Sequence, residues 1–139
     1  CDPFFMDENF LKTPQQPDVA DLSAAEGEAL AAAAASAGFA VLRLDGAAMK
    51  TKEELMDHAA AALALPGDFG RNWDALIDYM GSLAEFRKND RLLVVVGNSA
   101  AMRAADAALY GTFREVCGDA ADNARQWSRE RVIMKFLFL

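Results

Sequence analysis

The most informative segment of the chain is residues 65–78, which read LPGDFGRNWDALID. One proline and two glycines in its first half predict a loop. Asn72 then offers a side chain that accepts a hydrogen bond from a backbone N–H in the first turn of a helix. Behind it, large apolar residues recur at the i, i+3, i+4, i+7 spacing of one helix face; they are Trp73, Leu76, Ile77 and Met80. The segment therefore predicts a loop followed by an amphipathic helix that continues to about residue 83.

The other side of this predicted helix carries carboxylates. Asp74 and Asp78 are four residues apart, so their side chains are neighbours, and like charges at this spacing cost about 0.2 to 0.5 kcal/mol. Gly81, Ser82 and Glu85 are predicted to project from the same side, and no lysine or arginine lies on that stripe. Asp74 also lies in the first turn, where the helix dipole favours a carboxylate. A solvated acidic face and a binding surface are both consistent with this pattern.

The loop before the helix favours the binding surface. Asp68 adds a carboxylate near the same helix end, while Gly67 and Gly70 leave the backbone open to close approach by a partner. The whole chain has a formal net charge of −7, which argues against nucleic acid as the partner, because binding to phosphates needs clustered cations. The charge predicts a basic partner.

Helix and strand patterns alternate on both sides of this segment. Two capping boxes, Ser23 with Glu26 and Thr51 with Glu54, predict the starts of two further helices. Strands are predicted over residues 39–44, 92–96 and 132–139, and the second of these is apolar throughout, as in a buried parallel strand. The sequence therefore predicts an α/β fold in which a small three-stranded parallel sheet is packed by helices.

Composition and cysteine use indicate the class of protein. The chain has 139 residues, 53% of them apolar and 25% charged, as expected for one soluble globular domain. We assign residues 21–139 to that domain and residues 1–20, which hold three of the four prolines, to an extended or mobile arm. Two cysteines are too few for a disulfide framework, and the uncharged run at 29–37 is too short to span a bilayer. These features predict a cytoplasmic protein; the alternative is a processed lipoprotein with its lipid on Cys1.

Residues 65–78 resemble the loop and second helix of the barstar family, the intracellular inhibitors of the ribonuclease barnase. The matching features are Leu-Pro, an aromatic residue before Gly, the Asn, and Asp-Ala-Leu followed by a second Asp. The order of strands and helices also resembles the family over residues 39–139, whereas residues 1–38 lie outside the resemblance. In the family, the loop and helix fill the active-site cleft of the ribonuclease, with carboxylates where substrate phosphates would bind. The resemblance carries that role to Asp74 and Asp78.

The resemblance also implies further partner-binding residues and some departures. The additional contact residues are Asp68, Gly70, Asn72, Gly81 and Glu115, the last through a local match of Phe-Arg-Glu. The family has aromatic residues at the positions of Asp68, Ile77 and Leu83, so several aromatic contacts would be absent here. The span from Glu115 to the last strand is also longer than in the family. Whether the cognate enzyme or the affinity differs is left open.

The resulting functional prediction is a bacterial inhibitor of a barnase-like ribonuclease, acting as a monomer in a 1:1 complex. It has no catalytic residue, cofactor or metal, and binds neither nucleic acid nor a membrane. One alternative keeps the fold but makes the partner a different basic toxin nuclease, for which the chain would be the immunity protein. The other is a nucleotide-binding enzyme that uses the turn at Gly97 to hold an anion at a helix N-terminus, although this turn lacks the P-loop and dinucleotide fingerprints.

Two other groups of residues receive structural interpretations. A nucleophilic pair of Cys117 with the single histidine, His58, has no supporting motif, so a helical histidine without a catalytic role is preferred. Trp73 and Trp127 fall on the apolar sides of their predicted helices and are interpreted as core residues rather than stacking platforms.

Overall fold

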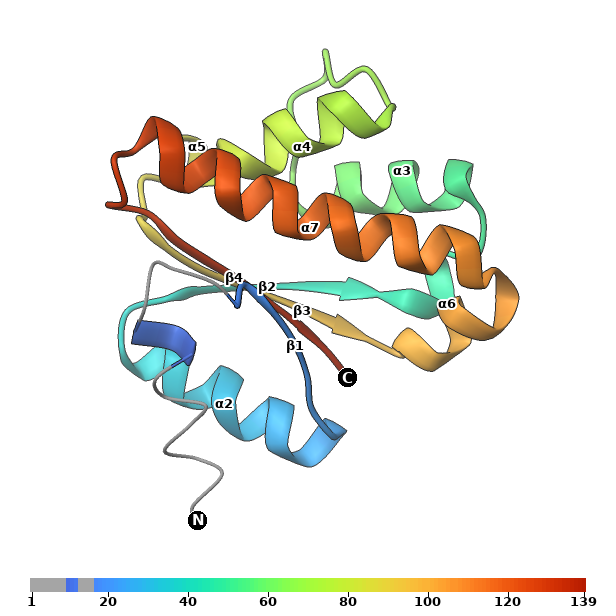
Figure 1. Ribbon diagram of the computed structural model, residues 1–139, viewed down its shortest axis with the longest axis horizontal. Coiled ribbons are helices and arrows are strands. Elements are labelled where there is room, and N and C mark those ends of the chain that lie inside the picture. The colour runs from blue at the N-terminus through green and yellow to red at the C-terminus, as the bar shows by residue number, and fades with distance from the viewer. Residues whose placement is uncertain (1–9, 13–16) are drawn as a thin grey trace.

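The molecule is built on a sheet of four parallel strands in the order β1-β4-β3-β2. A computed structural model describes residues 10–12 and 17–139 (Figure 1). The strands are β1 (Val19–Asp21), β2 (Ala40–Asp45), β3 (Arg91–Gly97) and β4 (Ile133–Phe138). The helices are α2 (Ala24–Ser36), the 3-10 helix η1 (Gly46–Ala48), α3 (Lys52–Ala62), α4 (Trp73–Gly81), α5 (Leu83–Arg87), α6 (Ser99–Ala105) and α7 (Ala107–Trp127).

The predicted α/β class with a parallel sheet packed by helices is confirmed, but the predicted number of three strands is wrong. The fourth strand, β1, pairs with β4 through Val19 opposite Phe136 and Asp21 opposite Phe138. It has only three residues and no alternating pattern, so its pairing depends on partners more than a hundred residues away. Residues 19 and 20 of the predicted arm thus belong to the sheet. The rest of that prediction falls partly on residues 1–9 and 13–16, outside the described residues.

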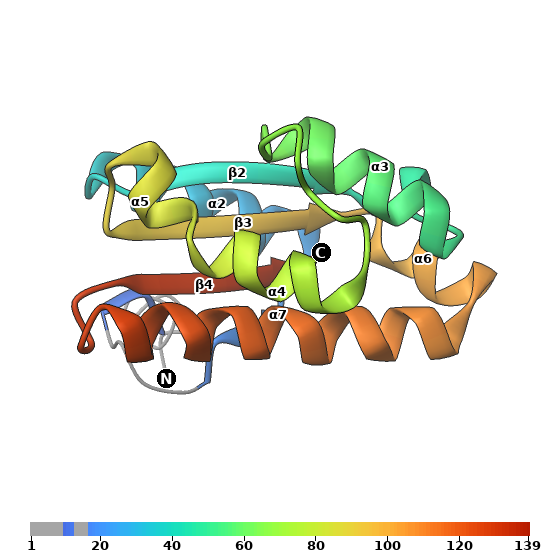
Figure 2. The ribbon, with the colours of Figure 1, turned by 90° about the horizontal axis from the view of Figure 1, so that it is seen from above.

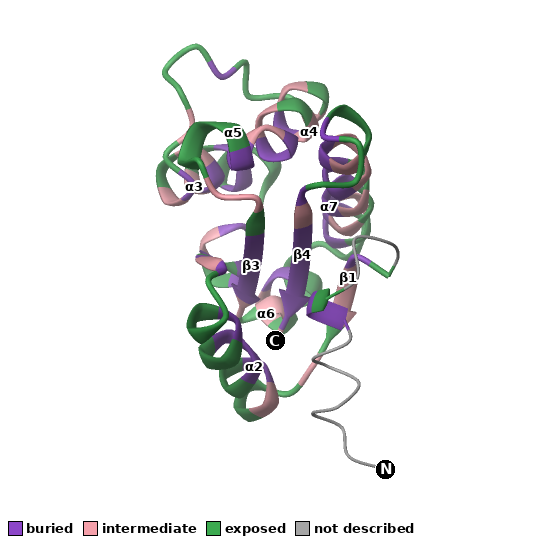
Figure 3. Cartoon of the chain, turned by 90° about the vertical axis from the view of Figure 1, so that its left-hand side faces the viewer, coloured by how far each residue is buried: buried purple, intermediate pink, exposed green. Residues whose placement is uncertain are grey.

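Helices cover both faces of the sheet (Figures 1 and 2). Alternate residues of a strand point to opposite faces, and on β3 the side chains at 92, 94 and 96 join the cluster under α3, α4 and α7. The side chains at 93 and 95 join a second cluster with α2 and the helical residues 10–12. Strands β3 and β4 are buried along most of their length as a result (Figure 3).

Helix α4 begins and ends for local reasons. The Asn72 side chain accepts a hydrogen bond from the N–H of Ala75 at 2.8 Å, which confirms the predicted N-cap. The helix ends at Gly81, earlier than expected, and the short helix α5 starts two residues later. Residues 65–72, which connect α3 to α4, project beyond the helices at the top of Figure 1.

Two kinds of feature are absent from the described residues. None of the helices in residues 10–12 and 17–139 combines the length and the hydropathy needed to cross a membrane. Within the same residues, no group of three or more His, Cys, Asp and Glu side chains is placed to hold a metal ion.

Candidate protein-binding surface

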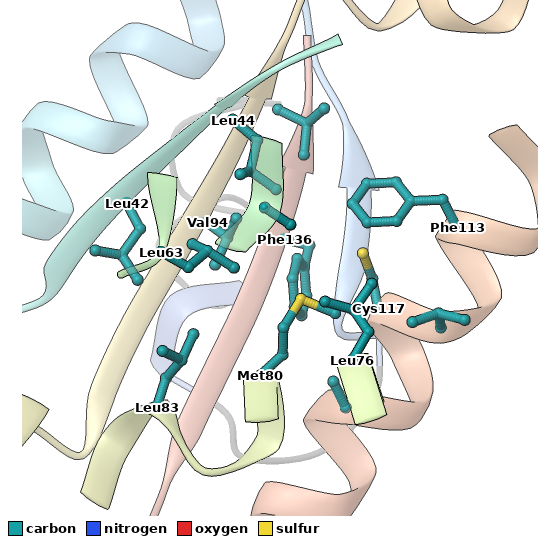
Figure 4. Close-up of a cluster of buried hydrophobic side chains, with 14 of the residues drawn as sticks. Leu42, Leu44, Leu63, Leu76, Met80, Leu83, Val94, Phe113, Cys117 and Phe136 are labelled. Carbon is teal, nitrogen blue, oxygen red and sulfur yellow. The ribbon is translucent and has the colours of Figure 1, made fainter. Parts of the chain in front are cut away.

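Helix α4 is held against the core along one side, and this fixes the direction of its other side. Leu76 and Met80 are fully buried, among side chains from β3, β4 and α7 (Figure 4). Burying a side chain of this size contributes about 1.5 to 3 kcal/mol, so rotation of the helix would lose several such contributions. Asp74 and Asp78 are therefore held in solvent on the outer side of the helix.

These two carboxylates have no counterion among the described residues. Every ion pair in that part of the chain involves other side chains. The nearest cation in the sequence, Arg71, binds Asp57 of α3 instead. No described side chain thus relieves the mutual repulsion of Asp74 and Asp78, which is the state expected of a surface whose counterions come from a partner.

Two of the predicted contact residues shape the loop in front of α4. Asn72 caps the helix through its side-chain oxygen and donates from Nδ2 to the carbonyl oxygen of Gly70 at 3.3 Å. A Cβ atom on Gly70 would lie 3.2 Å from that same Nδ2 atom and 3.7 Å from the Cβ of Ala75. The absence of a side chain at Gly70 therefore lets the loop close over the helix start.

The remaining part of the loop is tied to α4 by an aromatic side chain. The ring of Phe69 is buried and lies 5.5 Å from the ring of Tyr79, measured between centroids. An interaction with the carboxylate of Asp68 is the main cause of a raised pKa of the Tyr79 hydroxyl, and desolvation and the charge of Asp78 raise that pKa further. The contact between Phe69 and Tyr79 thus holds the loop against α4.

Gly81 occupies a different place from the one predicted. The sequence places it on the exposed side of the helix, and that placement is wrong, because Gly81 is buried against α7. A Cβ atom there would lie 2.8 Å from Nδ2 of Asn123 and 3.2 Å from the carbonyl oxygen of Ala120. The spacing within α4 could not reveal this contact, since it depends on a second helix that packs along the flank of the first.

The contact between α4 and α7 also places Glu115. The two helices pack together and run in the same direction (Figures 1 and 2). Gly81 meets Ala120, so five residues back along each helix Glu115 lies roughly level with Leu76, near the middle of α4. Glu115 is exposed. The fold thus brings Glu115, Asp74 and Asp78 onto neighbouring helices.

The last turn of α7 departs from the sequence prediction. Trp127, interpreted as a core residue, is 39% exposed. Its indole Nε1 donates to the carbonyl oxygen of Gly81 at 2.8 Å, and Arg131 lies over its ring. Trp127 therefore joins the end of α7 to the end of α4 at the surface, whereas Trp73 is partly buried against the core as predicted.

Comparison with protein families matches residues 39–138 to the family described as Barstar (barnase inhibitor). The chain belongs to the barstar family. No curated protein matches the chain. The matched residues of this barstar-family chain run from the residue before β2 to the end of β4, and include the loop, α4 and Glu115. Strand β1 and helix α2 precede the match, so part of the sheet and the cover of its second face lie outside the barstar match.

The site of the alternative enzyme is engaged in structural contacts in this barstar-family fold. At the end of β3, both the N–H and the hydroxyl of Ser99 donate to the carbonyl oxygen of Leu139, at 3.0 and 2.8 Å. Asn98 donates to the carboxylate of Asp45 at 2.9 Å, which places a negative charge beside the turn. Both donors of Ser99 at this helix N-terminus are therefore occupied, and the nearby charge opposes an anion.

The suggested cysteine and histidine pair is also engaged elsewhere. The ring nitrogen Nε2 of His58 accepts the backbone N–H of Asp45 at 2.9 Å. Cys117 is fully buried, and this burial raises the pKa of its thiol well above the usual range. A buried thiol with a raised pKa is a poor nucleophile, so both residues have structural explanations.

Proposed function

We propose that this barstar-family protein inhibits a barnase-like ribonuclease by placing α4 and residues 65–72 in the active-site cleft of the enzyme. The observation that supports the proposal most directly is the pair of exposed carboxylates, Asp74 and Asp78, on a helix whose other side is buried. Neither has a counterion among the described residues. A surface of this kind is complementary to a cluster of cations.

The chemistry of a ribonuclease active site supplies those cations. Such a site gathers basic side chains around the phosphodiester that it cleaves, and carboxylates can form charge-assisted hydrogen bonds with the same groups. Opposite charges on the two proteins also accelerate their encounter. The inhibitor acts by occlusion in a 1:1 complex and as a monomer, needs no cofactor, and works in the cytoplasm of the cell that makes the enzyme.

The deciding experiment is a titration of barnase activity with the purified protein. The wild type should abolish activity at a molar ratio near one, and unchanged activity at a tenfold excess would refute barnase as the target. Asp78→Ala should weaken the complex by about 2 to 5 kcal/mol, a range that itself draws on the barnase–barstar complex. Its free energy of unfolding should change little, because Asp78 is exposed and has no counterion to lose.

A matched control removes one carboxylate from another surface. Glu28 lies on α2, on the other side of the sheet, where it pairs with Arg43 in an exposed ion pair. Glu28→Ala should leave inhibition unchanged and change stability little, because the ion pair is exposed. Equal loss of inhibition in Glu28→Ala and Asp78→Ala would mean that only the net charge matters.

A second candidate partner is a different basic nuclease, for which this chain would be the immunity protein. The observation that favours it is that this chain has no aromatic side chain at three positions where the family has aromatic contact residues. Leu83 is buried in the core, Ile77 is partly buried against it, and Asp68 is acidic. A panel of basic nucleases, assayed with the wild type and the same variants, would identify such a partner. The cognate enzyme is the one that the wild type inhibits and that Asp78→Ala inhibits more weakly.

A further inference from the structure

Two large apolar side chains among the described residues are exposed, and both flank the last turns of α4. They are Phe86 at 50% and Trp127 at 39% exposure. Trp127 already has partners, because its indole is hydrogen-bonded to Gly81 and Arg131 lies over its ring. Phe86 has no such anchor. It contacts Tyr79 edge-on, with ring centroids 6.3 Å apart.

Phe86 is the last of three rings that cross from the loop to α5. Phe69, Tyr79 and Phe86 form this row, which we call the aromatic strip, with centroid separations of 5.5 and 6.3 Å. A hollow of about 370 Å³ borders its outer end and is lined by Leu63, Ala64, Leu83, Phe86 and Arg87. The strip lies on the flank of α4 opposite to α7, since Tyr79 and Gly81 are on different sides of the helix.

The charges around the aromatic strip are asymmetric. The carboxylates of Asp68 and of Asp78, the sequence neighbour of Tyr79, both raise the pKa of the Tyr79 hydroxyl. Arg87 stands at the opposite end, beside Phe86. Within the described residues, six contacts place a cation over a ring, and they involve five other rings but neither Phe86 nor Tyr79. The aromatic strip thus offers ring faces next to carboxylates, with no cation of its own on them.

We propose that the aromatic strip extends the partner-binding surface and receives an arginine or lysine side chain from the rim of the basic partner, between the rings and Asp78. The inference rests on the proposed function, because it assumes that α4 faces the partner. A cation is attracted to the face of an aromatic ring, and more strongly when the pair is shielded from water. The strip also provides aromatic contacts from positions other than 68, 77 and 83, where this chain lacks the aromatic residues of the family.

The first test measures the dissociation constant for barnase by calorimetry. Phe86→Ala should weaken binding about 5- to 30-fold. Phe86→Leu keeps an apolar side chain but no ring face, and should lose nearly as much. Phe86→Ala should lower the midpoint of thermal unfolding only slightly, because half of the side chain is already in solvent, and Phe86→Leu should lower it less. Affinity within twofold of wild type for Phe86→Ala, with Asp78→Ala still defective, would overturn the aromatic strip and leave the proposed function intact. Full affinity in Phe86→Leu would overturn the cationic occupant.

The second test does not depend on barnase. Amide resonances of the protein are followed by NMR during titration with a tri-arginine peptide, with triglycine as the control. The peptide should shift the amides of Tyr79 and Phe86, and Phe86→Ala should remove these shifts while those at Asp74 remain. This result without any binding to barnase would refute the proposed ribonuclease and retain the cation site. Shifts that are the same in Phe86→Ala would overturn the site.

Discussion

The two faces of the sheet are closed in different ways. On the face under α3, α4 and α7, strand β4 contributes the apolar side chain of Phe136, and the carboxylates of α4 stay in solvent. The residue of β4 just before Phe136 is Lys135, which faces the other side of the sheet and is fully buried. Its Nζ donates to Pro17 O at 2.9 Å and to Asp18 Oδ1 at 3.0 Å, and lies 5.1 Å from the ring of Phe10.

On the first face the carboxylates of α4 are exposed to solvent, whereas on the second face the charge of Lys135 is paired inside the protein. Asp18 is shared by two cations, since Arg125 also reaches it at 3.2 Å. Burial lowers the pKa of Lys135, and the hydrogen bond that Lys135 donates to Asp18 opposes that shift. Asp74 and Asp78 on the first face can meet a partner, whereas Asp18 holds the segment before the family match against β4 and α7.

The largest expected change in the free energy of unfolding follows from replacing Asp18, the buried carboxylate of the second face. Asp18→Ala removes the carboxylate that Lys135 and Arg125 share, and the loss of one member of a buried ion pair typically costs about 3 to 5 kcal/mol. Urea unfolding measures it. The control is Asp21→Ala at the end of β1, where the carboxylate is mostly exposed and its ion pair with Arg114 is worth about 1 kcal/mol. Equal losses of unfolding free energy in the two variants would contradict a stabilising role for the buried charges around Asp18.

A smaller effect is expected for the contact that orients the acidic helix. Gly81→Ala would bring a Cβ atom within 3.2 Å of the carbonyl oxygen of Ala120, and overpacking of this kind costs about 1 to 3 kcal/mol. It should also weaken inhibition, because α4 must shift. Gly118→Ala in α7 is the matched control: nothing lies within 4 Å of the added atom, so alanine should stabilise the helix by up to about 1 kcal/mol. A stable, fully active Gly81→Ala would show that this contact does not position α4.

The smallest expected effect is a pH dependence that belongs to the second face. Because the pKa of Lys135 is lowered in the folded state, the unfolded chain binds more protons between that pKa and the unfolded value of about 10.4. Stability contributed by this group therefore rises as pH increases through that window. The difference in unfolding free energy between wild type and Lys135→Met should move in favour of the wild type over the same range. A constant difference would show that the pKa of Lys135 is not lowered.

The sequence predicted the elements whose signals are local. The cap at Asn72 and the apolar spacing of Leu76 and Met80 lie within one helix, and both predictions are confirmed. Strand β1 was missed because three residues carry no pattern and the side chains that hold it come from β4 and α7. Gly81 was wrongly predicted to be exposed for a related reason, because that side of α4 is buried only by the neighbouring helix α7.

Periodicity alone did not reveal the aromatic strip. Tyr79 and Phe86 are seven residues apart, a spacing that one continuous helix would place on one face, but they lie on two helices separated by a break at Ser82, so the spacing could not show that the two rings meet. Asp74 and Asp78 were found by their spacing and remain predicted contact residues, as do Asp68 and Glu115. The exposure of Asp74 and Asp78 follows from their face of the helix, whereas contact with a partner also depends on the surface of that partner.

The position of β4 between β1 and β3 also bears on how the chain folds. Val19 pairs with Phe136, so the sheet cannot close until segments at opposite ends of the sequence meet. Contacts with such large sequence separation slow folding, because the entropy of closing the loop is lost before the contact forms. Phe136 is also part of the core beneath α4. The acidic surface should therefore become fixed late, when the last strand inserts and brings Lys135 to Asp18 in the same step.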